Sequence, residues 1–115
     1  MGRRNRKREK VVAPTSDYRD ADGNVLTLRG SLTPGARREY AETLRTGLDR
    51  EDAWQRAAEL LFERLAVSWT IADLEITRQH ELLGRYRMAS TDERRFVRNA
   101  LREHVVEHFP ELQAP

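Results

Sequence analysis

The chain has 115 residues, of which 38% are hydrophobic and 35% charged, with a net charge of +2. These values predict one soluble domain with a single modest core. The absence of cysteine excludes a disulfide framework and thiolate metal sites, and it favours the cytoplasm as the compartment. We expect neither secretion nor membrane contact, because no apolar run follows the basic start and no segment is apolar enough to span a bilayer.

The first ten residues hold the excess positive charge. They carry six basic residues and one acid, so the remaining chain has a net charge of −3. Residues 1–16 show no apolar period, which predicts a flexible basic arm before a single folded domain over residues 17–112. A solvated tail is the simpler interpretation of the arm, and nucleic-acid binding is the alternative. The residues that would then contact phosphates are Arg3, Arg4, Arg6, Lys7, Arg8 and Lys10.

Residues 17–30 have the pattern of a β-hairpin. The pair Asp22-Gly23 tolerates the backbone of a tight hairpin turn. Tyr18 precedes this turn, and Leu26 follows it among alternating apolar residues. We therefore predict two short antiparallel strands here.

Two helices are predicted to follow the hairpin. Thr33 is the expected N-cap of the first helix, Pro34 its first residue, and Gly47 its end. Asp49 is the expected N-cap of the second helix. The second helix has a wide apolar arc made of Trp54, Ala57, Ala58, Leu61, Phe62 and Leu65. A helix with so broad an arc packs on more than one neighbour, so we expect it at the centre of the fold.

The helical period breaks over residues 67–76, where we predict an irregular connector that could be partly extended. Thr77 is the expected N-cap of a third helix. Ser90 and Glu93 have the spacing of a capping box at the start of the last helix, which Pro110 ends. Together these elements predict a mainly α fold, a small domain of about four helices with a short N-terminal β-hairpin and a flexible basic arm.

His104, Glu107 and His108 form an H-x-x-E-H pattern in the last predicted helix. Two imidazoles four residues apart on a helix face the same way and could hold zinc, with the glutamate as a base. Only seven residues follow, and both histidines continue the apolar stripe of the helix. We therefore interpret them as half-buried residues that suit the negative end of the helix dipole, and we expect no metal, no cofactor and no enzymatic activity.

The last helix also carries a cationic face, and the chain offers three aromatic candidates for partner contacts. The cationic face consists of Arg94, Arg95, Arg98 and Arg102. Acidic residues lie among these arginines, which favours a solvated face with local ion pairs over phosphate contacts of the helix-turn-helix type. The aromatic candidates are Trp54, Trp69 and Phe62. For the two tryptophans, a place in the core is the simpler interpretation.

Four stretches set the layout of the chain: DADGNVLTLRGSLTPGARREYAE, EDAWQRAAELLFERLAVSW, ITRQHELLGRYR and ERRFVRNALREHVVEHFPEL. Their order and their Arg/Glu/Ala-rich composition resemble the small tail assembly chaperones of actinobacterial siphophages and prophages. The resemblance covers residues 17–112 and transfers no individual functional residue. It implies a non-enzymatic protein of the host cytoplasm that coats the helical tape-measure protein through apolar grooves until tail-tube subunits polymerise.

Two other functions stay open at this point. The chain could be a small nucleic-acid-associated protein that uses its basic arm, or a head–tail connector subunit that remains in the virion. Steep loss of affinity with salt would indicate phosphate contacts, and presence in the mature particle would indicate the connector. Self-association into a homo-oligomer is compatible with each of these functions.

Overall fold

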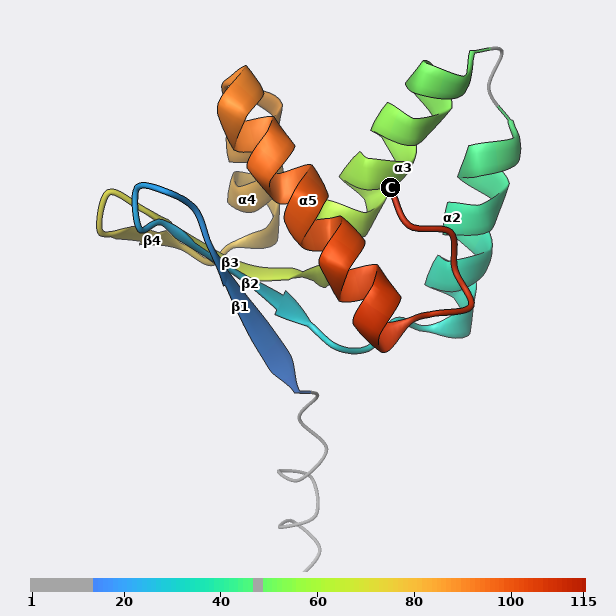
Figure 1. The fold of residues 1–115 in the computed structure, drawn as a ribbon, viewed down its shortest axis with the longest axis horizontal. Coiled ribbons are helices and arrows are strands. Elements are labelled where there is room, and N and C mark those ends of the chain that lie inside the picture. The colour runs from blue at the N-terminus through green and yellow to red at the C-terminus, as the bar shows by residue number, and fades with distance from the viewer. Residues whose placement is uncertain (1–13, 47–48) are drawn as a thin grey trace, which may run out of the picture.

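In the computed structural model, which describes residues 14–46 and 49–115, two strands and two helices are followed by two further strands and two further helices (Figure 1). The elements are β1 (Thr15–Arg19), β2 (Val25–Arg29), α2 (Pro34–Arg45), α3 (Arg50–Leu65), β3 (Ala66–Ile71), β4 (Leu74–Ile76), α4 (Gln79–Arg87) and α5 (Thr91–His108). The strands form one antiparallel sheet in the order β1-β2-β3-β4. The helices lie above this sheet in Figure 1, so the domain has two layers.

The prediction of a mainly α fold is therefore wrong, because the described residues form an α+β domain with a four-stranded sheet. The error lies in residues 67–76, where we predicted an irregular connector. In the structure these residues form most of a second hairpin, made of β3 and β4. The turn between these strands places Ala72 and Asp73 in the left-handed region, at φ 52° and 66°. Alanine is uncommon in that region, and the turn contains no glycine or asparagine, so the sequence gives only a weak signal for it. The side-chain oxygen of Asn24 in the first hairpin accepts a hydrogen bond from the backbone N–H of Ala72 (3.0 Å) and holds this turn.

The first hairpin is confirmed. Strands β1 and β2 pair in register with Tyr18 opposite Leu26, and Gly23 adopts a positive φ of 83° in the turn. The carboxylate of Asp20 accepts hydrogen bonds from the backbone N–H groups of Asp22 and Asn24, both at 2.9 Å, which closes the turn. Strand β1 begins at residue 15, so the last two residues of the predicted arm belong to the sheet. Residues 1–13 of that arm lie outside the described residues.

Alternation along the strands gives the sheet one buried face. Leu26 and Leu28 of β2 and Trp69 of β3 are almost fully buried under the helices, whereas Asp17 and Thr27 lie on the other face and hydrogen-bond to each other at 2.7 Å. Helix α3 lies at the centre, in contact with α2, α4, α5 and β3, as its wide apolar arc predicts. The largest buried side chains that join the sheet to the helices are Tyr40, Leu61, Phe62, Leu65, Trp69, Val97, Leu101 and Phe109.

Two of the predicted helix starts are confirmed by their hydrogen bonds. The hydroxyl oxygen of Thr33 accepts from the backbone N–H of Ala36 at 3.1 Å, with Pro34 as the first residue of α2. Ser90 and Glu93 form the capping box of α5, with bonds of 3.1 and 2.9 Å. These local signals can be read from sequence because donor and acceptor lie within one turn.

The other helix boundaries follow the sequence less closely. Helix α4 is capped by Arg78 rather than the predicted Thr77, and no side chain caps it. Asp49 is the N-cap residue of α3, but its side chain makes no capping bond. The predicted end of the first helix at Gly47 lies outside the described residues.

The segment after α5 ties two helices together. Residues 110–115 run from the end of α5 back across α2, as the red trace in Figure 1 shows. The buried Tyr40 hydroxyl of α2 donates to the carbonyl of Gln113, and Arg102 Nε of α5 donates to the carbonyl of Pro115 at 2.9 Å. The last residues thereby link α2 to α5 by hydrogen bonds.

Candidate functional site

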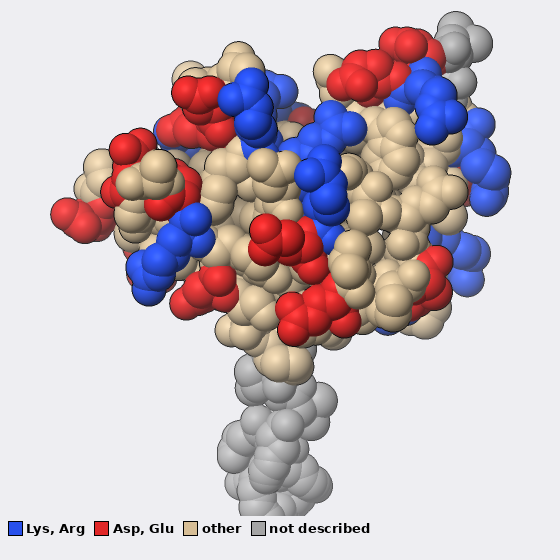
Figure 2. Space-filling view, in the orientation of Figure 1, with Lys and Arg blue, Asp and Glu red and all other residues tan. Residues whose placement is uncertain are grey.

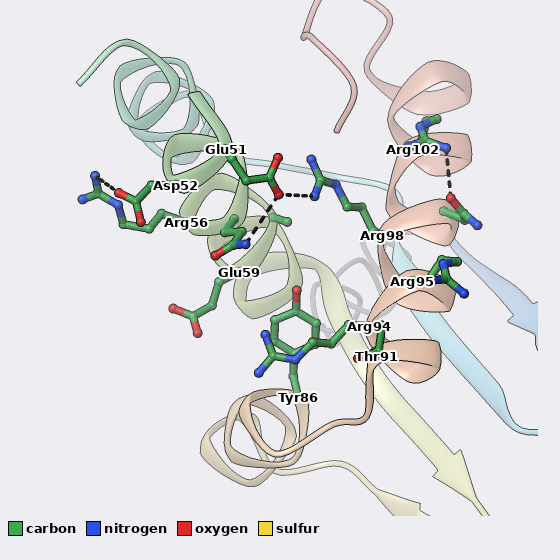
Figure 3. Close-up of a pocket in the computed structure, with 13 residues that line it drawn as sticks. Glu51, Asp52, Arg56, Glu59, Tyr86, Thr91, Arg94, Arg95, Arg98 and Arg102 are labelled. Carbon is green, nitrogen blue, oxygen red and sulfur yellow. Dashed lines mark hydrogen bonds and ion pairs between the residues drawn. The ribbon is translucent and has the colours of Figure 1, made fainter. Parts of the chain in front are cut away.

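A groove of about 620 Å³ lies between α3 and α5, with Tyr86 of α4 among its lining residues (Figure 3). In the space-filling view the surface is hollowed between α5 and α3, and basic side chains gather there (Figure 2). The charged lining residues are Glu51, Asp52, Arg56, Glu59, Arg94, Arg95, Arg98 and Arg102. Five cations against three carboxylates make the groove net positive, although the chain after residue 10 is net negative.

One wall of the groove comes from α5. Arg94, Arg98 and Arg102 are spaced by four residues, which places them on one face of the helix. In Figure 3, Arg94 and Arg98 point from α5 towards α4 and α3, whereas Arg95 and Arg102 lie over α5 itself, and Arg102 donates to Asn99 of the same helix at 2.9 Å. The structure thus brings together the cationic face that the sequence predicts, and it adds that this face is the wall of a groove rather than a convex surface.

The opposite wall comes from α3 and is mostly acidic. Glu51 Oε2 lies 3.5 Å from Arg98 Nη1, a long ion pair that spans the groove. The carboxylate of Glu59 accepts a hydrogen bond of 2.8 Å from Nε of Arg87 in α4. This hydrogen bond lowers the pKa of Glu59 below its ordinary value, so its carboxylate stays ionised. The α3 wall carries three carboxylates and Arg56, and each carboxylate is already paired with an arginine, Asp52 with Arg56 at 2.9 Å.

Two arginines of the α5 wall differ in how far the protein satisfies them. Arg94 lies over the ring of Tyr86, with 5.4 Å from its guanidinium carbon to the ring centroid, and Nη2 donates to the carbonyl of Arg87 at 2.7 Å. Arg98 has a buried Nε that finds no hydrogen-bond partner among the described residues. Burying a guanidinium N–H without an acceptor costs free energy. Among the described arginines of this wall, Arg98 is the one whose unpartnered donor is buried.

The three aromatic candidates for partner contacts lie elsewhere. Phe62 and Trp69 are almost fully buried and pack edge to face, with their ring centroids 5.8 Å apart. Phe62 also stacks on Tyr86 at 4.8 Å. Trp54 is half-buried on α3 and packs against the core. Phe62 and Trp69 are therefore parts of the core that supports the groove, and neither presents a ring to the surface.

The H-x-x-E-H pattern is built into a polar contact between α5 and the hairpin. His104 is fully buried, and its Nε2 lies 2.8 Å from the carbonyl oxygen of Arg29. A carbonyl only accepts, so Nε2 carries the proton and Nδ1 accepts from the Tyr18 hydroxyl at 2.7 Å. His108 packs against His104 with ring centroids 4.4 Å apart, and its Nε2 lies 3.3 Å from Ser16 Oγ. Both nitrogens of His104 are engaged, and no three metal-ligating side chains cluster among the described residues.

We expect the burial of His104 to make stability depend on pH. Desolvation lowers its pKa below the ordinary 6.5, with a smaller effect in the same direction from His108, while the Arg29 carbonyl and Glu107 oppose the shift. The unfolded chain therefore binds more protons at this position as the pH falls. The free energy of unfolding should be highest above about pH 6.5 and decline from there towards about pH 5, before the carboxylates with lowered pKa values, Glu59 and Glu93, begin to titrate. Urea denaturation at a series of pH values would measure this, and a flat profile over that window would contradict it.

The basic residues of the predicted arm, Arg3, Arg4, Arg6, Lys7, Arg8 and Lys10, lie outside the described residues. Among the residues that are described, no helix is both long and apolar enough to cross a membrane. No family model, characterised protein or solved structure matches the chain.

Proposed function

We propose that this protein is a non-enzymatic tail assembly protein that binds the tape-measure protein of its phage or prophage in the host cytoplasm and keeps it soluble. The observation that supports this most is the open groove between α3 and α5. A groove between two helices is a common receptor for a helical segment of a partner, and the tape-measure protein is helical in the family that the sequence resembles.

The structure changes the expected mode of contact. The wide apolar arc of α3 is used inside the domain, where Phe62 and Leu65 are fully buried, so it does not serve the client. The surface left for a client helix is the groove with charged walls and Tyr86 at its base. Binding would then combine packing along the groove with ion pairs at its two walls.

Co-expression with the tape-measure protein of the same genome tests this proposal. We expect the full chain to raise the soluble yield of the client several-fold and to copurify with it. The charge-reversal pair Arg94→Glu and Arg98→Glu should abolish the gain, because it removes the positive wall. The matched control is Arg19→Glu with Arg38→Glu, which changes the same number of charges at exposed positions away from the groove. A client that stays insoluble with the wild-type chain would contradict the proposal.

Two measurements would distinguish the chaperone from the nucleic-acid-binding protein and the head–tail connector. Binding of duplex DNA that is lost between about 50 and 200 mM salt would indicate phosphate contacts and favour the nucleic-acid function. Stoichiometric recovery of the chain in purified virions would favour a head–tail connector. Either result, together with an insoluble client, would replace the chaperone proposal.

A further inference from the structure

We propose that two copies of this chain pair along their β1 strands into a dimer with one continuous antiparallel sheet, in which Asp17 of each copy lies opposite Arg19 of the other. This interface is separate from the α3–α5 groove and goes beyond the proposed function. Three features of β1 carry the proposal: its free backbone groups, its regular shape and its charge pattern.

Strand β1 has a free edge, because β2 pairs with one side of it and no described strand pairs with the other. The residues that flank the strand show which backbone groups bond to β2. The N–H of Gly30 donates to the carbonyl of Pro14 at 2.7 Å, and the N–H of Asp20 donates to the carbonyl of Asn24 at 3.1 Å. Alternate residues of an antiparallel strand bond to the same neighbour, so the odd-numbered residues of β1 direct their N–H and carbonyl groups outward. These residues are Thr15, Asp17 and Arg19.

The strand also has the regular shape that a further strand needs. Its residues pair with β2 in one register without a bulge, whereas the register between β2 and β3 shifts. Bulges, prolines and inward-pointing charges are common ways of blocking an exposed edge, and residues 15–19 contain none of them. The inward side chains contact α5: Ser16 Oγ lies 3.3 Å from His108. The Tyr18 hydroxyl lies 2.7 Å from His104, so α5 holds the edge in place.

The charges of β1 complement each other when the strand meets a copy of itself. Asp17 and Arg19 are exposed on the face of the sheet away from the helices. Arg19 has no ion-pair partner among the described residues. If the two Tyr18 residues lie opposite each other in an antiparallel pair, each Asp17 lies opposite an Arg19. Both residues have outward backbone groups, so each such pair exchanges two backbone hydrogen bonds and adds a cross-strand ion pair.

Other registers of the same pairing are less favourable. A shift of one residue sets outward backbone groups against groups that already bond to β2. A register with Asp17 opposite its own copy brings two carboxylates together, which is destabilising. A register with Thr15 opposite Asp17 leaves Arg19 opposite no residue of the other strand. The charges of the edge therefore select the register with two Asp17–Arg19 pairs.

The proposed pairing ends at two copies, because it uses the same edge of both. The other edge of the sheet is β4, which has only three residues and so offers little for further pairing. The two-fold axis of an antiparallel edge contact is perpendicular to the sheet. The helices cover one face of the sheet (Figure 1), so the dimer presents both α3–α5 grooves on the same side.

The test is the association state of the full chain. The contact is short, so we expect a weak reversible dimer with a dissociation constant between about 10 μM and 1 mM by sedimentation equilibrium. Amide hydrogen exchange then locates the interface. The amides of Thr15, Asp17 and Arg19 should exchange at least about twofold more slowly at about 1 mM protein than at about 10 μM, because each then donates to the other copy.

Charge variants test the register. Arg19→Asp and Asp17→Arg each set like charges opposite each other at both pairs, so each should raise the dissociation constant about tenfold or more. The double variant exchanges the two charges and should return to within about threefold of wild type. Arg38→Asp makes the same change of charge at an exposed position of α2 and should stay within about twofold of wild type. Unchanged thermal midpoints will show that the variants are folded.

A chain that stays monomeric up to about 1 mM overturns the inference, and so does a dimer that Arg19→Asp leaves intact or that the double variant fails to restore. Protection of the three outward amides in a monomer would show that another segment covers the edge, which also overturns it. None of these results bears on the client, because the α3–α5 groove does not include β1. The pair Arg19→Glu with Arg38→Glu should therefore lose the dimer and still solubilise the client.

Discussion

Replacing Phe62 by alanine should lower the free energy of unfolding by about 3–5 kcal/mol. Phe62 is fully buried in α3, where its ring meets Trp69 and stacks on Tyr86, so truncation leaves a cavity at the contact between α3, α4 and the sheet. A small domain has a total stability of only about 5–15 kcal/mol, so this loss is large. Urea denaturation followed by circular dichroism would measure it.

The control for this variant is Leu74→Ala, since Leu74 is 68% exposed at the start of β4. We expect that change to alter the free energy of unfolding by less than about 0.5 kcal/mol. If Phe62→Ala instead kept the stability of the parent but lost the client, Phe62 would be a partner-binding residue on the surface, and the packing described above would be incorrect.

His104→Ala should lower the free energy of unfolding by about 2–4 kcal/mol. The variant removes a buried ring and leaves both the Tyr18 hydroxyl and the Arg29 carbonyl without their partner. It should also flatten the decline in stability below about pH 6.5, because the group with the lowered pKa is gone. A purely packing role for His104 would reproduce the loss of stability but leave the pH profile unchanged.

His108→Ala is the matched control, four residues along the same helix. His108 is only partly buried, and its contact with Ser16 is 3.3 Å, so we expect a loss of about 1 kcal/mol or less. Equal losses for the two histidines would show that the hydrogen bonds of His104 contribute little.

The sequence predicts those parts of the fold whose causes are local. The caps at Thr33 and Ser90 and the Asp22-Gly23 turn are confirmed because each depends on residues within one turn of the chain. The second hairpin was missed because its turn begins with Ala72, which does not carry the usual signal for a positive φ, and no glycine follows Asp73. What holds that turn is Asn24, 48 residues away, and such a contact cannot be read from the local pattern.

For the same reason, the sequence predicts only one wall of the candidate site, the arginines of α5. The spacing of Arg94, Arg98 and Arg102 indicates one helix face, and the structure confirms it. That Glu51 and Glu59 of α3 form the facing wall is a result of how α3 and α5 cross the sheet. Likewise, the apolar pattern around Phe62 does not tell whether the ring meets the core or a partner.

The bond between Tyr18 and His104 joins residues 86 positions apart, and this has a consequence for how the domain folds. The first hairpin is made early, but α5, which supplies His104, is made after every other described element of the domain. Until α5 docks, Leu26 and Leu28 have no complete cover, and closing so long a loop slows folding. A nascent chain that stops before α5 should therefore stay aggregation-prone, with all four strands already made and their shared core still open to water.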